Sequence, residues 1–309
     1  MSVEVKDLTK VFAQQTAVDS ISFSAVKGKI TGFLGPNGAG KSTTMKMATC
    51  FIPPTSGTIS VCGFDVVQQP MEVKKRVGYL PEHNPLYLDM YVHEYLEFIA
   101  SLHKIGNRTQ ARVKEVIGMC GLSLEQNKKI GALSKGYRQR VGISQTLIHD
   151  PEVLILDEPT TGLDPNQIIE IRKLIKDLGR DKTVVFSSHI LQEVEAICDQ
   201  VIIINKGKLV ADASVKELLK LNNIACLHVR FNGTLDSLQL KAIAGVSNVQ
   251  VQADGSVYIH YNIDQPIQEG LMRYATTNGL QLQEMKQVEQ NLESIFRSLT
   301  NPLQKTELI

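Results

Sequence analysis

The fold of this chain is decided by one short stretch, Gly35-Pro36-Asn37-Gly38-Ala39-Gly40-Lys41-Ser42. It fits the pattern Gly-x-x-x-x-Gly-Lys-Ser/Thr at every fixed position, after a β-rich run from Lys29 to Leu34 and before a helical segment. Glycines let the backbone wrap around phosphate oxygens with its N–H groups turned inward, and the helix dipole adds positive potential there. The stretch therefore predicts a phosphate-binding loop, with Lys41 reaching the β- and γ-phosphates and the Ser42 hydroxyl binding Mg²⁺.

Two other glycine-rich architectures are excluded by the same residues. A dinucleotide-binding Gly-x-Gly-x-x-Gly turn starting at Gly38 and Gly40 would require glycine where the chain has Thr43. A protein kinase would carry His-Arg-Asp and Asp-Phe-Gly triplets, and the sequence contains neither.

A second motif consists of the apolar run Val153–Leu156 followed by Asp157 and Glu158. A buried strand that ends in two acids places carboxylates at the carboxyl edge of a sheet, where ligands bind. Asp157 is suited to hold Mg²⁺ through its water shell, and Glu158 to polarise an attacking water. Alone, the pattern also suits a solvated strand end; beside the phosphate-binding loop it predicts catalytic acids.

The hydrophobic pattern predicts an α/β domain over residues 1–220. Unbroken apolar runs such as Val153–Leu156, Thr183–Phe186 and Val201–Ile204 alternate with helical segments, as in a parallel sheet covered on both faces. Between about 84 and 150 the pattern is helical, which predicts an inserted helical subdomain.

Residues 224–300 predict a second, small α+β domain. Strand and helix patterns follow in the order βαββαβ, with the turn Asp254-Gly255 between two alternating runs, which is typical of a ferredoxin-like fold. From Ile224 to the end there are 6 Lys+Arg against 8 Asp+Glu, and no chemical motif. We expect a regulatory or dimer-stabilising role for this part.

Composition argues against a nucleic-acid-binding, a membrane-spanning and a secreted protein. The 309 residues include 33 Lys+Arg and 32 Asp+Glu, so the formal charge of +1 gives no reason to expect a nucleic-acid partner. The longest apolar runs are strand-length, far below the ~20 residues that cross a bilayer, and no secretory signal is visible. The five cysteines show no Cys-x-x-Cys spacing, which favours reduced thiols in a cytoplasmic protein.

With these motifs in place, the chain resembles the ATP-binding subunits of ABC transporters over residues 2 to about 215. Leu133-Ser134-Lys135-Gly136-Tyr137 is similar to that family's signature motif Leu-Ser-Gly-Gly-Gln, with departures at Lys135 and Tyr137. Ser134 also has the chemistry of a simple helix N-cap. In the family, the signature contacts the γ-phosphate of ATP held by the opposite subunit.

Four further positions match the family pattern. Phe12 resembles the aromatic residue that stacks on adenine, although a packed sheet-edge residue fits nearly as well. Glu82 occupies the place of a glutamine that senses Mg²⁺ and the membrane partner, and a carboxylate cannot donate hydrogen bonds as that amide does. Asp164 resembles a residue that communicates across the dimer, but Asp164-Pro165 is also a good helix start. His189 resembles the switch histidine that contacts the γ-phosphate.

The motifs and the resemblance together assign three groups of residues. Glu158 and His189 are expected to be catalytic, and Ser42, Glu82 and Asp157 to bind Mg²⁺, Asp157 through water. The residues expected to bind ATP are Phe12, Gly35, Pro36, Asn37, Gly38, Ala39, Gly40, Lys41, Ser42, Thr43, Glu82, Ser134, Gly136 and Asp164.

The resemblance implies an ATPase that dimerises around two ATP molecules, as a homodimer or pseudo-dimer, and drives a separate transmembrane permease from the inner face of the membrane. Tyr79–Asn84 and the variant signature resemble the ABC-2 type exporter branch, most closely the ATP-binding subunit associated with bacterial gliding motility. A soluble ABC ATPase acting on ribosomes or DNA is the alternative. The ribosomal class is disfavoured because it would carry two phosphate-binding loops in one chain, and this chain has one. The DNA-repair class is disfavoured because it would insert a long coiled coil between the loop and the signature, and here only 93 positions separate Lys41 from Ser134. A non-hydrolysing nucleotide-binding scaffold is a third possibility, disfavoured by Glu158 beside Asp157.

Overall fold

The computed structural model describes residues 1–221, 224–233, 235–252, 254–288 and 292–300. It divides the chain into two units, Met1–Ser214 and Val215–Ile309. The boundary expected near residue 220 falls inside helix α8 (Val215–Leu221), which contacts helix α11 (Leu292–Thr300) of the second unit.

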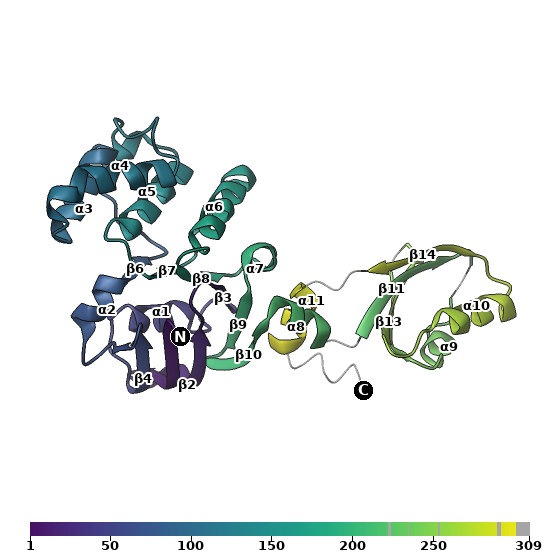
Figure 1. Cartoon of the computed structure of the whole chain (residues 1–309). Helices are drawn as coiled ribbons and strands as arrows, with labels where there is room; N and C mark the ends of the chain where they lie inside the picture. Colours follow the sequence, from purple (N-terminus) through teal and green to yellow (C-terminus); the bar gives the residue numbers. More distant parts are fainter. Residues whose placement is uncertain (222–223, 234, 253, 289–291, 301–309) are drawn as a thin grey trace. The chain divides into compact units, whose positions relative to one another are not determined.

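The first unit is built on a six-stranded sheet with the strand order β10-β9-β3-β8-β7-β6 (Figure 1). Five of these strands run parallel, and β10 pairs antiparallel with β9 at the edge. Every residue of β3, β7 and β8 is buried, as a sheet covered on both faces requires. The predicted parallel sheet is confirmed. Its strands are β3 (Ile30–Leu34), β6 (Val77–Leu80), β7 (Val153–Leu156), β8 (Thr183–Ser188), β9 (Gln200–Asn205) and β10 (Lys208–Ser214).

A second sheet in this unit, antiparallel and of order β2-β1-β4-β5, was not predicted as a sheet. Its apolar side chains, such as Val5 and Ile59, belong to the same buried cluster as Phe33 and Ile155 of the parallel sheet. The two sheets therefore share one core. The strands are β1 (Val3–Phe12), β2 (Gln15–Ala25), β4 (Ser56–Val61) and β5 (Phe64–Asp65).

Three helices fill the stretch between β6 and β7, within the range where a helical subdomain was expected. They are α3 (Val92–Leu102), α4 (Thr109–Met119) and α5 (Lys135–Leu147), with short 3-10 turns η1 (Gly106–Arg108) and η2 (Ile130–Ala132). Figure 1 shows the three helices grouped together, apart from strands β2 and β4. The remaining helices of the unit are α1 (Lys41–Ala48), α2 (Pro70–Arg76), α6 (Pro165–Leu178) and α7 (Leu191–Ile197). Among the described helices, none is long and apolar enough to cross a membrane.

The second unit has the predicted βαββαβ order. Its four strands form an antiparallel sheet of order β12-β13-β11-β14, which is the ferredoxin-like arrangement. Gly255 has φ +81° in the turn between β12 and β13, as the Asp254-Gly255 signal predicts. The elements are β11 (Ile224–Phe231), α9 (Ser237–Lys241), β12 (Val246–Val251), β13 (Val257–Asn262), α10 (Gln268–Thr277) and β14 (Leu282–Val288). The terminal helix was expected to start at Asn291, which lies outside the described residues.

A stacked histidine pair joins the helical segment to the sheet. The rings of His103 and His149 lie parallel with centroids 4.1 Å apart, and Nε2 of His149 is 3.0 Å from the carbonyl oxygen of Val77. Burial, and then the nearby His103, lower the pKa of His149 to about 4. His149 is therefore neutral in the folded protein at neutral pH.

The pair predicts a pH-dependent loss of stability. At pH values between the unfolded pKa of His149, about 6.5, and its folded pKa, this histidine is protonated in the unfolded chain and neutral in the folded chain. Acidification therefore favours unfolding. When the pH is lowered from 7 to 4.5, the free energy of unfolding of the wild type should decrease by about 2 to 3 kcal/mol more than that of His149→Gln. The glutamine keeps an amide donor for the carbonyl oxygen of Val77. Urea unfolding at the two pH values measures this, and equal losses in the two proteins would contradict it.

Candidate active site

The phosphate-binding loop lies between β3 and α1, as predicted. Gly40 forms the N-cap of α1 with φ +111°, and a Cβ there would lie 2.6 Å from the carbonyl oxygen of Ala17. Only glycine fits this conformation and this close approach. Within the described residues no side chain caps α1, so its first amides can bind an anion.

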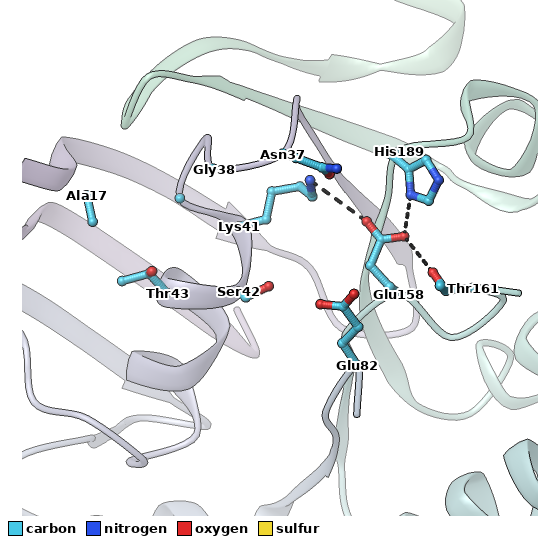
Figure 2. Close-up of a pocket in the computed structure, with 11 residues that line it drawn as sticks. Ala17, Asn37, Gly38, Lys41, Ser42, Thr43, Glu82, Glu158, Thr161 and His189 are labelled. Atoms are coloured by element: carbon cyan, nitrogen blue, oxygen red, sulfur yellow. Dashed lines mark hydrogen bonds and ion pairs between the residues drawn. The ribbon is translucent and has the colours of Figure 1, made fainter. Parts of the chain in front are cut away.

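The loop opens into a cavity of about 390 Å³. Four segments meet there, each at the carboxyl end of a parallel strand: the loop after β3, Glu82 after β6, Glu158 after β7 and His189 after β8 (Figure 2). These strands are neighbours in the sheet, so the fold brings together side chains up to about 150 positions apart. The cavity is lined by Ala17, Asn37, Gly38, Gly40, Lys41, Ser42, Thr43, Glu82, Glu158, Thr161 and His189.

Lys41 is buried at the base of this cavity. Its ammonium donates to the carbonyl oxygens of Gly35 at 2.7 Å and Pro36 at 3.3 Å, and lies 3.8 Å from Oε1 of Glu158. Burial lowers the pKa of Lys41, while the carboxylates of Glu158, Asp157 and Glu82 oppose that shift. The lysine is thus held in place by weak acceptors that a phosphate can replace.

Glu158 is the centre of the polar contacts drawn in Figure 2. Nδ1 of His189 lies 2.7 Å from its Oε2, and the Thr161 hydroxyl donates to the same oxygen at 3.3 Å. Since a carboxylate can only accept, Nδ1 of His189 carries the proton of this bond. The backbone of Glu158 has φ +50°, a strained conformation for a residue with a Cβ, and such strain is concentrated at functional sites.

Asp157 is buried beside Glu158 and is held by two hydroxyl groups. Ser42 donates to its Oδ1 at 3.1 Å and Ser187 at 2.7 Å, while the Ser187 hydroxyl also accepts from the amide of Glu158 at 2.8 Å. The predicted pair Ser42 and Asp157 is therefore in direct contact. Of the two, Ser42 lines the cavity, as does Glu82.

Sequence reasoning missed Ser187 and Thr161. Both are hydroxyl residues adjacent to predicted site positions, Ser187 at the end of β8 and Thr161 three residues after Glu158. That proximity to a strand's carboxyl end was the available signal. The Thr161 contact with Glu158 is local, but the Ser187 contacts depend on the pairing of β7 with β8, which single-sequence patterns do not give.

Eight predicted residues lie outside the lining of this cavity. Four of them belong to segments that border it, namely Gly35, Pro36 and Ala39 of the loop and the buried Asp157, and the other four are Phe12, Ser134, Gly136 and Asp164. Phe12 is 47% exposed on the β1–β2 hairpin, so it is not a packed residue. Ser134 accepts from the Tyr137 amide at 3.4 Å and caps α5, and Asp164 accepts from the Gln167 amide at 2.9 Å and caps α6. Gly136 is buried on α5, where a Cβ would lie 2.6 Å from the Gln167 side chain.

The whole chain is similar to proteins of a known family. A sequence model described as "ABC transporter" matches residues 18–161. The bacitracin transport ATP-binding protein of Bacillus licheniformis is 34% identical over 299 residues, covering 96% of each chain. The linearmycin resistance ATP-binding protein of Bacillus subtilis is 32% identical over 96% of this chain and 98% of its own. A solved structure of an ATP-binding subunit of an ABC transporter superposes with a TM-score of 0.65 at 27% identity, over 72% of this chain and 93% of that one.

Proposed function

This chain belongs to the ABC transporter family and is an ATP-binding, ATP-hydrolysing protein. We propose that it is the ATPase subunit of an exporter whose membrane-spanning part is a separate chain. The observation that carries the chemistry is the meeting of Lys41, Glu158 and His189 around one cavity at the carboxyl edge of the sheet. The names of the bacitracin and linearmycin relatives support export as the process that is driven.

The residues around the cavity have two tasks in ATP hydrolysis: some bind the phosphates, and others position and polarise the attacking water. The amides of the loop and the ammonium of Lys41 bind the β- and γ-phosphates. Glu158 accepts a hydrogen bond from the attacking water, and His189 and Thr161 hold its carboxylate in position. The water oxygen bonds to the γ-phosphorus in line with the leaving β–γ bridging oxygen, so the products are ADP and phosphate.

The site has the oxygen donors that Mg²⁺ prefers. Ser42 and Asp157 are 3.1 Å apart, and Glu82 lines the same cavity. Across the described residues no group of three or more His, Cys, Asp or Glu side chains is placed to hold a metal ion. In ATPase sites Mg²⁺ is commonly bound by one or two carboxylates together with substrate phosphates. When bound, the cation neutralises charge on the transferred phosphoryl group.

The positions of Ser134, Gly136 and Asp164 support a dimer that closes on two ATP molecules. They lie outside the lining of the chain's own cavity, and Ser134 and Asp164 are exposed at the N-termini of α5 and α6. In the proposed dimer they complete the partner's site, and Phe12 stacks on adenine. Dimer closure and reopening then move the permease, with the chain held at the inner face of the membrane.

Association with a membrane partner can be tested directly. The tagged full chain, purified from detergent-solubilised membranes of the cells that carry it, should retain an integral membrane protein in near-equal amount. ATP turnover of that complex should differ from turnover of the isolated chain. Recovery of ribosomes or DNA instead would favour the soluble alternative and contradict the exporter.

A finer proposal places the exporter in a gliding-motility complex. The segment Tyr79–Asn84 and the signature variant Leu133–Arg140 support it. Disruption of the gene should then abolish spreading on surfaces while sensitivity to peptide antibiotics is unchanged. Normal spreading with raised antibiotic sensitivity would contradict this placement and favour drug export.

A further inference from the structure

Glu193 is a buried acid that the proposed hydrolysis does not use. It lies on α7 and its side chain is fully buried. Its Oε2 accepts two hydrogen bonds, from the hydroxyls of Thr160 and Ser188, each at 2.8 Å. Its Oε1 lies 3.7 Å from Nη2 of Arg172 on α6 and has no hydrogen-bond partner within the described part of the chain.

The two hydroxyl partners flank the groups that face the γ-phosphate. Thr160 is two residues after Glu158, and Ser188 directly precedes His189. Arg172 lies on the helix that Asp164 caps. Glu193 therefore contacts the segments that carry the proposed water-polarising acid, the switch histidine and the residue expected to face the second subunit.

Three sets of contacts tie the segment after β7 to the last residues of β8 and to His189 directly after them. Ser187 binds both Asp157 and the amide of Glu158, and His189 binds the Glu158 carboxylate. The Thr160–Glu193–Ser188 bridge is the third set and lies away from the cavity lining. A carboxylate that can only accept fixes the direction of both hydroxyls.

We propose that Glu193 is a positioning residue: by holding Thr160 and Ser188 together, it sets the geometry of the Glu158–His189 pair for attack on the γ-phosphate. The proposal rests on the proposed ATP hydrolysis. Its physical basis is that small displacements of reacting groups reduce rates strongly, by about 10²-fold for 1 Å. Burial makes the bridge rigid, because a hydroxyl that loses its acceptor there finds no water to replace it.

Turnover and ATP binding of the full chain test this role. Glu193→Gln and Thr160→Val should each lower kcat by about 10-fold or more, while KM and the ATP Kd stay within about 2-fold, since neither residue touches the cavity. Thr160→Ser keeps the hydroxyl and should restore kcat to within about 2-fold of the wild type. Gln192→Ala, an exposed change on the same helix, is the matched control and should leave both constants unchanged.

The imidazole NMR signals of His189, assigned with His189→Gln, give a second measurement that needs no turnover. In Thr160→Val and Glu193→Gln they should shift or broaden, and in Gln192→Ala they should stay in place. Unchanged His189 signals, or a kcat per folded molecule equal to that of the wild type, would overturn the positioning role. Absence of turnover in the wild type would instead overturn the proposed function, and the NMR comparison would still decide the role of Glu193.

Discussion

Replacing Glu158 by glutamine is expected to stop ATP turnover while ATP remains bound. The amide keeps the shape of the side chain but accepts protons poorly, and a positioned general base contributes about 10²- to 10⁴-fold to a rate. The expected fall in kcat is therefore about 10²-fold or more. Because the bound ATP is not consumed, the variant should accumulate as an ATP-bound dimer.

Phosphate release and size-exclusion chromatography with and without ATP measure the two effects of Glu158→Gln. Glu152→Gln is the matched control, since Glu152 is exposed and lies just before β7, at the opposite end of the same strand. It should show wild-type turnover. Hydrolysis by Glu158→Gln at the wild-type rate would show that another group polarises the water.

Replacing Lys41 by alanine is expected to weaken ATP binding itself. The wild-type ammonium already lies in the cavity, held by two carbonyl oxygens and near Glu158, so little rearrangement is needed to meet a phosphate. Hydrogen bonds to charged groups contribute about 1.5 to 3 kcal/mol, which corresponds to about 10- to 100-fold in the ATP Kd.

Isothermal titration with ATP and Mg²⁺ measures the loss in Lys41→Ala, with circular dichroism to show that the variant is folded. Lys46→Ala, in the last turn of the same helix, is the control and should bind ATP as the wild type does. An unchanged ATP affinity in Lys41→Ala would contradict the assignment of this loop to phosphate binding.

The parallel sheet and the phosphate-binding loop could be predicted because their signals are local. Strand β7 is four apolar residues followed by two acids, and every one of its side chains is buried. Glu158 was found for the same reason, as the second residue after a buried strand, whereas His189 was found by its resemblance to the family's switch histidine. In the second unit, Asp254-Gly255 marked a hairpin by its turn chemistry alone.

Strand β1 escaped prediction because its alternation is broken. Asp7 has φ +47°, and the register with β2 shifts between Val5 and Leu8. Such a bulge moves the following side chains to the other face, so the period of two is lost within one strand. The antiparallel sheet could not be recognised from the pattern for this reason.

The contacts of Ser187 and Glu193 could not be predicted from the sequence. Ser187 meets Asp157 across two strands, and Glu193 reaches both loops from a helix. The sequence around Glu193 shows only an acid in the first turn of a helix, which is ordinary at that position. Its burial, and therefore its proposed role, follows from tertiary packing.

Phosphate release by the purified full chain at saturating ATP and Mg²⁺ tests whether this protein hydrolyses ATP with Glu158 as the water-polarising acid. Continuous release by the wild type is expected, reduced about 10²-fold or more in Glu158→Gln and unchanged in the control Glu152→Gln. Release at the same rate by wild type and Glu158→Gln, or no release by the wild type in its membrane complex, would contradict it.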